Sequence, residues 1–134
     1  YDLLKDSGIF LLHTIGQSSS PSATSPWIQK YIFPGGYIPS LSEIIKATEN
    51  LNINVTDIEV LRMHYAYTLD HWHKNTIQNK ENIIKLFNEN FFRMWEYYLL
   101  ISKYSFINMG NVVFQIQISK NINNLPITRN YIYT

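Results

Sequence analysis

The apolar run at residues 9–12, Ile-Phe-Leu-Leu, lies between Gly8 and His13 and is uninterrupted by polar side chains. A run of this length fits a strand that is covered on both faces, as in the parallel sheet of an α/β protein. Ligands in open α/β sheets gather outside the carboxyl ends of the strands, so His13 would lie where a functional residue is expected. Such a strand also needs paired neighbours and helices over both faces, which sets a minimum size for the fold.

Two further strands and several helices are predicted along the rest of the chain. Residues 53–63 and 112–118 are rich in β-branched residues that alternate with polar ones, which is typical of strands with one wetter face. Ser40 and Glu43 form a capping box, which marks the start of a helix. Helical spacing covers a last turn at 1–5 and four longer stretches, 27–33, 41–49, 68–78 and 80–102. The pattern is that of an α/β fold with about three strands and covering helices.

The chain is expected to form one unit followed by a short tail. Its 134 residues are 46% hydrophobic, which is enough to bury a core. The Asn-rich segment 120–134 fits a frayed end, although Tyr131 and Tyr133 could still dock. Residues 1–119 carry all the predicted strands, but three strands supply few neighbours for the run at 9–12. The rest of the sheet is therefore expected upstream, in the same chain or in another one.

Composition excludes several classes of function. The formal net charge is +1 with Lys and Arg scattered, so nothing favours nucleic acid as a partner. The chain has no Cys, which excludes thiolate metal sites and is compatible with a cytoplasmic location. His64, His71 and His73 do not predict zinc, because residues two apart face different sides of a helix. No apolar run approaches the roughly 20 residues that span a bilayer, so a soluble protein without a secretory signal is expected.

Several groups of residues occur in the order and spacing of a known family. They are Gly-Ile-Phe-Leu-Leu-His-Thr-Ile-Gly at 8–16, Pro-Trp-Ile at 26–28, Lys-Tyr-Ile-Phe-Pro-Gly-Gly at 30–36, Ile-Pro-Ser-Leu-Ser-Glu-Ile at 38–44, His-Tyr-Ala at 64–66 and Phe-Arg-Met-Trp at 92–95. Over residues 1–119 the chain thus resembles the cyclopropane-fatty-acyl-phospholipid synthases, a family that includes the mycolic acid cyclopropane synthases. Residues 26–44 are the most specific part of the resemblance.

The resemblance implies a fold. It implies the carboxy-terminal half of a class I S-adenosylmethionine-dependent methyltransferase, with a Rossmann-like sheet. The three strands would be the fifth, sixth and seventh of that sheet, with the last running antiparallel between the other two. The glycine-rich cofactor loop of such folds lies on early strands, and Gly35 and Gly36 do not replace it because they follow a helical stretch and Pro34.

The resemblance also implies an activity. The complete enzyme would transfer a methylene group from S-adenosylmethionine to the double bond of unsaturated phospholipid acyl chains, in the cytoplasm or at the inner face of the membrane. A cyclopropane and a methyl branch would both arise from the same cation. Because the cofactor loop is absent from the sequence, the chain alone is expected to be inactive and to need the missing amino-terminal half.

A base for the reaction follows from the same resemblance. The base of the family is a bound bicarbonate, held by a His, a backbone group, a Tyr and an upstream Glu and Cys. The matching positions in this chain are His13, Ile15 and Tyr65, of which His13 and Tyr65 would be catalytic. The residues by themselves leave a second interpretation open, since a His at a strand end is commonly structural and a Tyr is commonly a buried ring.

An aromatic stripe is the candidate wall of the acyl-chain pocket. Phe91, Trp95 and Tyr98 recur at helical spacing, which fits an ordinary core, a lipid tunnel, or both on different faces of one helix. The aromatic residues of segment 27–33, beside Lys30, fit either a buried helix or a membrane surface.

The sequence departs from the family pattern near this stripe. Residues 101–104 are Ile-Ser-Lys-Tyr, where the family usually has small residues or Cys, and Tyr67 replaces a residue that is commonly smaller or basic. Bulk at 101–104 would narrow a lipid tunnel. The competing hypothesis is therefore a non-catalytic remnant or a lipid-binding module from a split or decayed gene.

Overall fold

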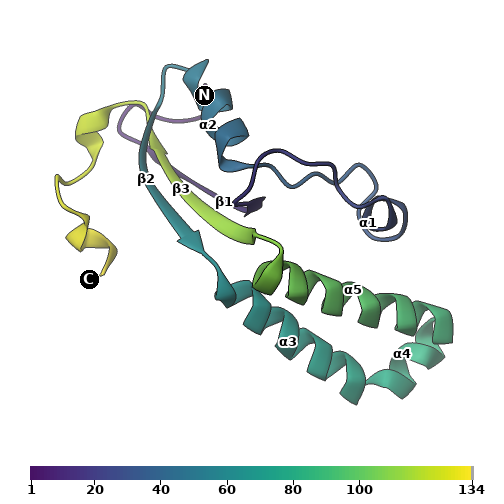
Figure 1. Ribbon diagram of the computed structural model, residues 1–134. Coiled ribbons are helices and arrows are strands. Elements are labelled where there is room, and N and C mark those ends of the chain that lie inside the picture. Colours follow the sequence, from purple (N-terminus) through teal and green to yellow (C-terminus); the bar gives the residue numbers. More distant parts are fainter. Residues whose placement is uncertain (134) are drawn as a thin grey trace.

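A sheet of three strands organises the computed structural model, which describes residues 1–133 (Figure 1). The strands are β1 (Ile9–Gln17), β2 (Asn54–Leu61) and β3 (Asn111–Ser119). Their order is β1-β3-β2, and β3 pairs antiparallel with both of its neighbours. Leu12 lies opposite Ile116, which in turn lies opposite Ile58. The predicted place of the last strand, antiparallel between the other two, is confirmed.

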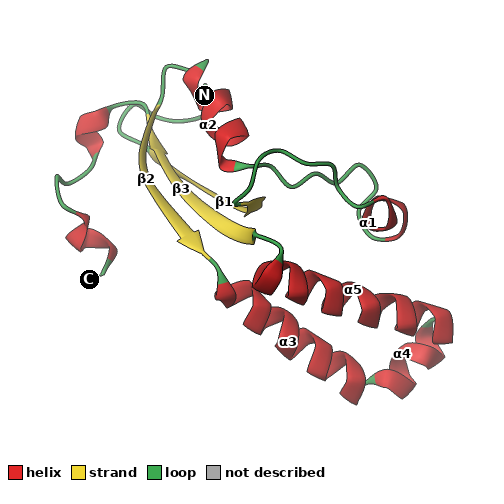
Figure 2. Cartoon of the chain, viewed as in Figure 1, coloured by secondary structure: helices red, strands yellow, loops and turns green. Residues whose placement is uncertain are grey.

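Helices lie around the sheet and extend from one end of it (Figure 2). Those in residues 1–133 are α1 (Pro26–Tyr31), α2 (Leu41–Glu49), α3 (Met63–Gln78), α4 (Lys80–Leu86), α5 (Glu89–Asn108) and the 3-10 helices η1 (Ile122–Asn124) and η2 (Arg129–Ile132). α3 and α5 are antiparallel and lie side by side, and α4 joins their far ends (Figure 1). The predicted α/β pattern of three strands with covering helices is confirmed.

β3 divides the hydrophobic core into two clusters, because alternate side chains of a strand point to opposite faces. On one face, the cluster around Phe114 is covered by Leu41 of α2. On the other face, Val113 packs with Leu69 of α3 and Leu99 of α5. Beyond Val113 this second face carries Gln115 and Gln117, which are only half-buried, so the predicted strand with one wetter face is confirmed.

β1 is an edge strand of the described sheet, as expected for a strand whose other neighbours and cover are not among these residues. β3 pairs with one edge of β1, and Ile9, Phe10 and Leu11 are 48%, 48% and 55% exposed. The strand continues to Gln17, so His13 lies in its middle and not at its carboxyl end. Burial needs neighbours on both sides, and β2 lies on the far side of β3.

Residues 1–7 form turns, whereas the sequence predicts the last turn of a helix at 1–5. The Leu4 N–H donates to the Tyr1 carbonyl at 3.1 Å, and the Gly8 N–H donates to the Lys5 carbonyl at 2.8 Å. Both bonds span three residues. So short a stretch has too few bonds between residues four apart to nucleate an α-helix.

A helix boundary interrupts the stretch 80–102, which the spacing predicts as one helix. α4 ends at Leu86 and α5 begins at Glu89. Between them, the side chain of Asn88 accepts a hydrogen bond from the Phe91 N–H at 2.8 Å. Asn is a favoured N-cap residue, and this local bond starts a new helix. The apolar stripe continues across the boundary, which is why spacing alone does not reveal it.

The capping box before α2 is confirmed, and both ends of α2 are where the sequence predicts them. The Ser40 N–H donates to Glu43 Oε2 at 2.9 Å, and the Tyr37 hydroxyl donates to Glu43 Oε1 at 2.7 Å. The Tyr37 bond, followed by the Ser40 backbone bond, lowers the pKa of Glu43. A bridge between Gln17 and Ser40 ties the start of α2 to the end of β1.

The chain after β3 folds back onto the sheet as far as Tyr131, so it is not frayed there, and the docking that the sequence left open for Tyr131 is observed. Arg129 Nε lies 2.6 Å from Asp57 Oδ2 on β2, and the Tyr131 hydroxyl donates to the Gln117 side chain at 2.9 Å. Tyr133, by contrast, is 79% exposed. These contacts depend on the position of the sheet, so composition alone does not predict them.

Asp70 of α3 joins α5 through a charge pair, and this predicts an acid-sensitive contact. Lys103 Nζ lies 2.5 Å from Asp70 Oδ1, and Lys74 Nζ lies 2.7 Å from Oδ2. The Lys103 hydrogen bond first, and then that of Lys74, lowers the pKa of Asp70 from 3.8 to about 2. A lowered carboxyl pKa stabilises the folded state above the unfolded value, and this contribution is lost as the pH falls through about 2.

Thermal unfolding of the wild type and of Asp70→Asn measures this contribution. The wild type should have the higher Tm at neutral pH, and the difference should shrink from about pH 4 downward and vanish near pH 2. A difference in Tm that is independent of pH would contradict the charge pair as its cause.

Candidate functional site

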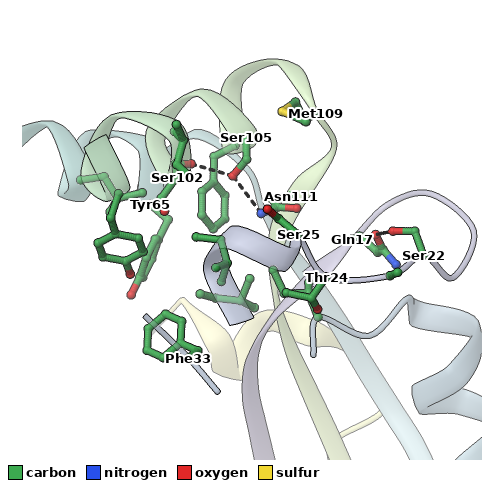
Figure 3. A pocket seen from close by; sticks show the side chains of 18 of the residues that line it. Gln17, Ser22, Thr24, Ser25, Phe33, Tyr65, Ser102, Ser105, Met109 and Asn111 are labelled. Carbon is green, nitrogen blue, oxygen red and sulfur yellow. Dashed lines mark hydrogen bonds between the residues drawn. The ribbon is translucent and has the colours of Figure 1, made fainter. Parts of the chain in front are cut away.

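A cavity of about 550 Å³ lies where the end of β1, the following loop, α1, α3 and α5 meet (Figure 3). The apolar part of its wall includes Phe33, Tyr65, Leu69, Tyr98, Ile101 and Phe106. The polar part includes Gln17, Ser22, Thr24, Ser25, Ser105 and Asn111. No charged side chain of residues 1–133 lines the cavity, so it suits an uncharged and largely apolar ligand.

Tyr65 reaches the cavity because α3 begins two residues after β2 ends. Its ring packs against Phe106 with centroids 5.1 Å apart and meets Trp72 edge-on at 6.1 Å. These contacts fix the ring, while the hydroxyl makes no hydrogen bond to any residue of the described chain. Tyr65 therefore lies in the cavity wall with a free polar tip.

Tyr98 of α5 faces the same cavity. Burial first, and then the nearby Tyr65 phenol, raise the pKa of Tyr98. Both effects disfavour the phenolate, so the Tyr98 hydroxyl stays protonated at neutral pH. Of the three lipid-pocket candidates that the sequence offers, Tyr98 is the one that lines the cavity.

The other two candidates, Phe91 and Trp95, do not line the cavity. Their rings are parallel along α5 with centroids 6.3 Å apart, and Phe91 also stacks on Phe87 at 4.2 Å. Trp95 packs against the core cluster that contains Leu99. Both residues come earlier on α5 than Tyr98, nearer its α4 end and farther from the sheet (Figure 1). Their observed contacts are those of packing residues.

Ile15 of β1 lines the cavity and packs against the cluster that contains Val113. Two residues after Ile15, the Gln17 N–H points away from β3 and donates to the Pro39 carbonyl at 3.0 Å. The N–H of the following residue, Ser18, points the opposite way and donates toward β3. Backbone groups of a strand alternate between its two edges, so the Ile15 N–H lies on the outer edge with that of Gln17. The Ile15 N–H is therefore not used in the hydrogen bonds between β1 and β3.

His13 precedes Ile15 by two residues, so its side chain lies on the same face of the sheet. It is exposed and does not line the cavity. Its Nδ1 lies 3.2 Å from Nε2 of Gln115, its partner on β3. An amide nitrogen only donates, so Nδ1 accepts and the neutral ring carries its proton on Nε2. His13 and Tyr65 share one face of the sheet, but within residues 1–133 no hydrogen bond joins them.

The sequence interpretation missed the role of α1 and its flanks in this wall. Phe33 lines the cavity and meets Tyr98 edge-on with ring centroids 5.9 Å apart. Trp27 meets Tyr97 in the same way at 4.8 Å. α1 therefore covers the cavity. The aromatic composition of the segment was the available signal, but it fits a membrane surface equally well.

The departure from the family pattern at 101–104 falls partly in the cavity wall. Ile101 and Ser102 line the cavity, whereas Lys103 pairs with Asp70 and Tyr104 is 54% exposed. Ile101 is thus the bulky residue of this segment that takes up space in the pocket.

His64, His71 and His73 lie on α3, where the first two are exposed and His73 is half-buried. No group of three His, Cys, Asp or Glu side chains in the described chain is arranged to hold a metal ion. His73 lies 3.4 Å from Glu96 of α5. None of the helices within residues 1–133 has both the length and the apolar character needed to cross a membrane.

Comparison with known proteins shows which family this chain belongs to. The family model for mycolic acid cyclopropane synthetase matches residues 1–116. The chain belongs to this family. It is 45% identical over 85 residues to the tuberculostearic acid methyltransferase of Mycobacterium tuberculosis, which covers 62% of the chain and 20% of that relative. It is 34% identical over 121 residues to the cyclopropane-fatty-acyl-phospholipid synthase of Escherichia coli, covering 90% and 31%.

Members of the mycolic acid cyclopropane synthetase family also share the fold. The crystal structure of a mycolic acid cyclopropane synthase in complex with SAH and CTAB matches with a TM-score of 0.75 and 29% identity, over 83% of this chain and 44% of that one. The chain therefore spans less than half the length of these relatives. The comparisons confirm the predicted fold class and the predicted family of S-adenosylmethionine-dependent methyltransferases.

The described residues do not fit the cofactor-binding part of such a fold. Gly35 has a φ of +74°, but it follows α1 and Pro34, and an added Cβ would meet no atom within 4 Å. The cofactor loop of a Rossmann-like fold instead joins a strand to a helix and lets the backbone approach the ligand. Residues 1–133 therefore contain the cavity but no glycine-rich strand-to-helix loop of the kind that binds such a cofactor.

Proposed function

We propose that this chain forms the acceptor side of an S-adenosylmethionine-dependent lipid methyltransferase that modifies the double bonds of unsaturated acyl chains. The observation that carries the proposal is the uncharged cavity of about 550 Å³, in a chain of the mycolic acid cyclopropane synthetase family. An acyl chain is the kind of largely apolar ligand that such a wall accommodates. The name of the Escherichia coli relative specifies a phospholipid, and we propose the same acceptor class for this protein.

Aromatic rings in the cavity suit the chemistry of alkene methylation, which creates a carbocation. Tyr65 and Tyr98 both line the cavity. A ring face attracts a cation by roughly 2 kcal/mol or more where water is excluded. Loss of a proton from the added methyl group closes a cyclopropane ring, and another fate of the same cation gives a branched product. The two curated relatives are named a methyltransferase and a cyclopropane synthase.

Bicarbonate is the base that we propose for this proton transfer. His13, the Ile15 backbone N–H and the Tyr65 hydroxyl would hold it, and when bound it would supply a general base. The outer-edge position of the Ile15 N–H and the free Tyr65 hydroxyl support this assignment. Nδ1 of His13 is occupied by the Gln115 amide, which leaves Nε2 as the ring nitrogen that would contact the anion.

The amino-terminal half of a family domain is the partner that we propose for β1, in the same chain or in another one. Apart from the bridge at Gln17, no strand in residues 1–133 pairs with the outer edge of β1, and Ile9, Phe10 and Leu11 are exposed beside it. Proteins cover or blunt such apolar edges. The solved relative has more than half of its length outside the match, which is enough to supply further strands and the cofactor site.

A cytoplasmic location at the inner face of the membrane fits a phospholipid acceptor. Tyr31 and Phe33 are 49% and 52% exposed, and Lys30 Nζ lies 5.1 Å from the centroid of the Tyr31 ring. Aromatic residues and Lys favour the interface between membrane and water. We therefore propose α1 and the residues just after it as the part that contacts the bilayer.

A chimera tests the proposed activity. In the chimera, this chain replaces the matching carboxy-terminal segment of the Escherichia coli cyclopropane-fatty-acyl-phospholipid synthase. The chimera and the 134-residue chain would each be mixed with labelled S-adenosylmethionine and vesicles of unsaturated phospholipid. The chimera is expected to label the lipid and the chain alone is not, because the cofactor loop lies outside it. Labelling by the chain alone, or none by a folded chimera that binds the cofactor, would contradict the proposal.

A lipid-binding module without catalysis is the second candidate, because the described residues line the cavity without help from another chain. In that case the chain should pellet with vesicles of unsaturated anionic phospholipid in the absence of any cofactor or partner. A chain that stays in the supernatant would remove this candidate.

A further inference from the structure

Gln17 ends β1 and lies in the polar part of the cavity wall, where it is 8% exposed (Figure 3). Its backbone N–H donates to the Pro39 carbonyl at 3.0 Å, and its side-chain Oε1 accepts a hydrogen bond from the Ser22 hydroxyl at 2.8 Å. The side-chain nitrogen Nε2 has no partner. Among residues 1–133 it is the only buried side-chain nitrogen or oxygen of which this is true.

A buried amide nitrogen without a partner is unfavourable, because water satisfies the same group in the unfolded chain. Gln17 has little freedom to avoid this cost. Its backbone is held between Asn111 of β3 on one side and Pro39 on the other, and a flip of its amide would only exchange an unpartnered nitrogen for an unpartnered oxygen. A group of this kind at the wall of a cavity indicates that a ligand supplies the acceptor.

We infer that Gln17 Nε2 donates a hydrogen bond to an uncharged oxygen of the bound lipid, such as an ester carbonyl. The inference rests on the proposed function, because it requires a lipid in this cavity. The acyl chain would then extend from Gln17 along the apolar wall toward Tyr65 and Tyr98. Gln17 is in this sense a specificity-determining residue, which sets how far along the pocket the double bond lies.

The uncharged wall of the cavity favours a carbonyl oxygen over a phosphate oxygen as the acceptor for Gln17. A phosphate oxygen would also accept from Gln17, but no Lys, Arg or His of residues 1–133 lines the cavity to balance its charge. A buried anion without a cation is far less favourable than a carbonyl with one donor. Hydroxyl groups at Ser22, Ser25 and Ser105 make this end polar without making it charged.

Nuclear magnetic resonance of the full chain tests the inference with two probes of equal chain length, methyl decanoate and n-dodecane, delivered from cyclodextrin. The side-chain amide resonances of Gln17, assigned in the wild type through their couplings to the Gln17 backbone, are expected to shift with the ester and to stay in place with the alkane. Gln17→Leu should weaken ester binding roughly 2- to 12-fold, the usual effect of one hydrogen bond, and leave alkane binding unchanged. Gln78→Leu, on the exposed last turn of α3, is the matched control and should bind both probes normally.

The other possible outcomes separate a wrong role for Gln17 from a wrong assignment of the pocket. Ester that binds without moving the Gln17 amide resonances, or Gln17→Leu that weakens ester and alkane equally, would overturn the role of Gln17 and leave the lipid pocket standing. Failure of both probes to bind the wild type would overturn the pocket and the inference together. Because the resonance shift is measured on the wild type, the test holds even if Gln17→Leu does not fold.

Discussion

Replacing Tyr65 with phenylalanine is expected to slow methyl transfer by the chimera about 100-fold or more, with little change in stability. The phenylalanine ring keeps the contacts with Phe106 and Trp72, whose centroids lie 5.1 and 6.1 Å away. Only the hydroxyl is lost, and it has no hydrogen bond within the described chain that could explain a change in stability. The loss should therefore fall on kcat, measured with labelled S-adenosylmethionine, and not on Tm.

Tyr67→Phe is the matched control for this experiment. Tyr67 lies two residues further along α3, is 63% exposed and does not line the cavity. Its substitution should leave the rate within about twofold of the parent, as is usual for a surface change without a partner. A Tyr65→Phe chimera as fast as the Tyr67→Phe chimera would show that the Tyr65 hydroxyl takes no part in the reaction.

The largest effect on stability is expected from Leu99→Ala. Leu99 is 0% exposed and lies at the junction of α5 with Leu69 of α3 and Val113 of β3. Truncating a fully buried leucine removes apolar contacts and leaves a cavity, at a cost of about 2–5 kcal/mol. The corresponding fall in Tm is roughly 10 °C for a chain of this size, measurable by circular dichroism.

Leu86→Ala provides the comparison, because Leu86 ends α4 and is 77% exposed. Its free energy of unfolding should stay within about 0.5 kcal/mol of the wild type. Equal losses at the two positions would mean that α5 does not pack on the sheet as described.

Local signals in the sequence predicted the elements whose stability is local. Ser40 and Glu43 are three residues apart and make their capping box from neighbours alone, so both ends of α2 were predicted. Asn88 is also a local signal, but the apolar stripe on either side of it outweighed it, and one helix was predicted where two exist. The central position of β3 was implied by the resemblance and not by its own pattern, which indicates a half-wet strand.

Features that depend on distant parts of the chain were not predictable from pattern. The exposure of β1 depends on how many strands lie beside it, which no residue of the run at 9–12 encodes. The polar end of the cavity depends on Gln17 meeting Ser22 in a segment with no periodicity. Tyr98 and Phe91 belong to one periodic stripe, yet only Tyr98 lies far enough along α5 to reach the cavity.

The helix over the cavity has a consequence for how fast ligands exchange. α1 has six residues, none of them buried, and two edge-on ring pairs, Trp27 with Tyr97 and Phe33 with Tyr98, connect this segment to α5. Each ring pair contributes about 0.5–1.5 kcal/mol beyond the apolar area that it buries, whereas Leu99 in the core is 0% exposed. We therefore expect α1 to detach before the rest of the molecule unfolds, in which case a long chain would enter broadside instead of threading end first through a narrow mouth.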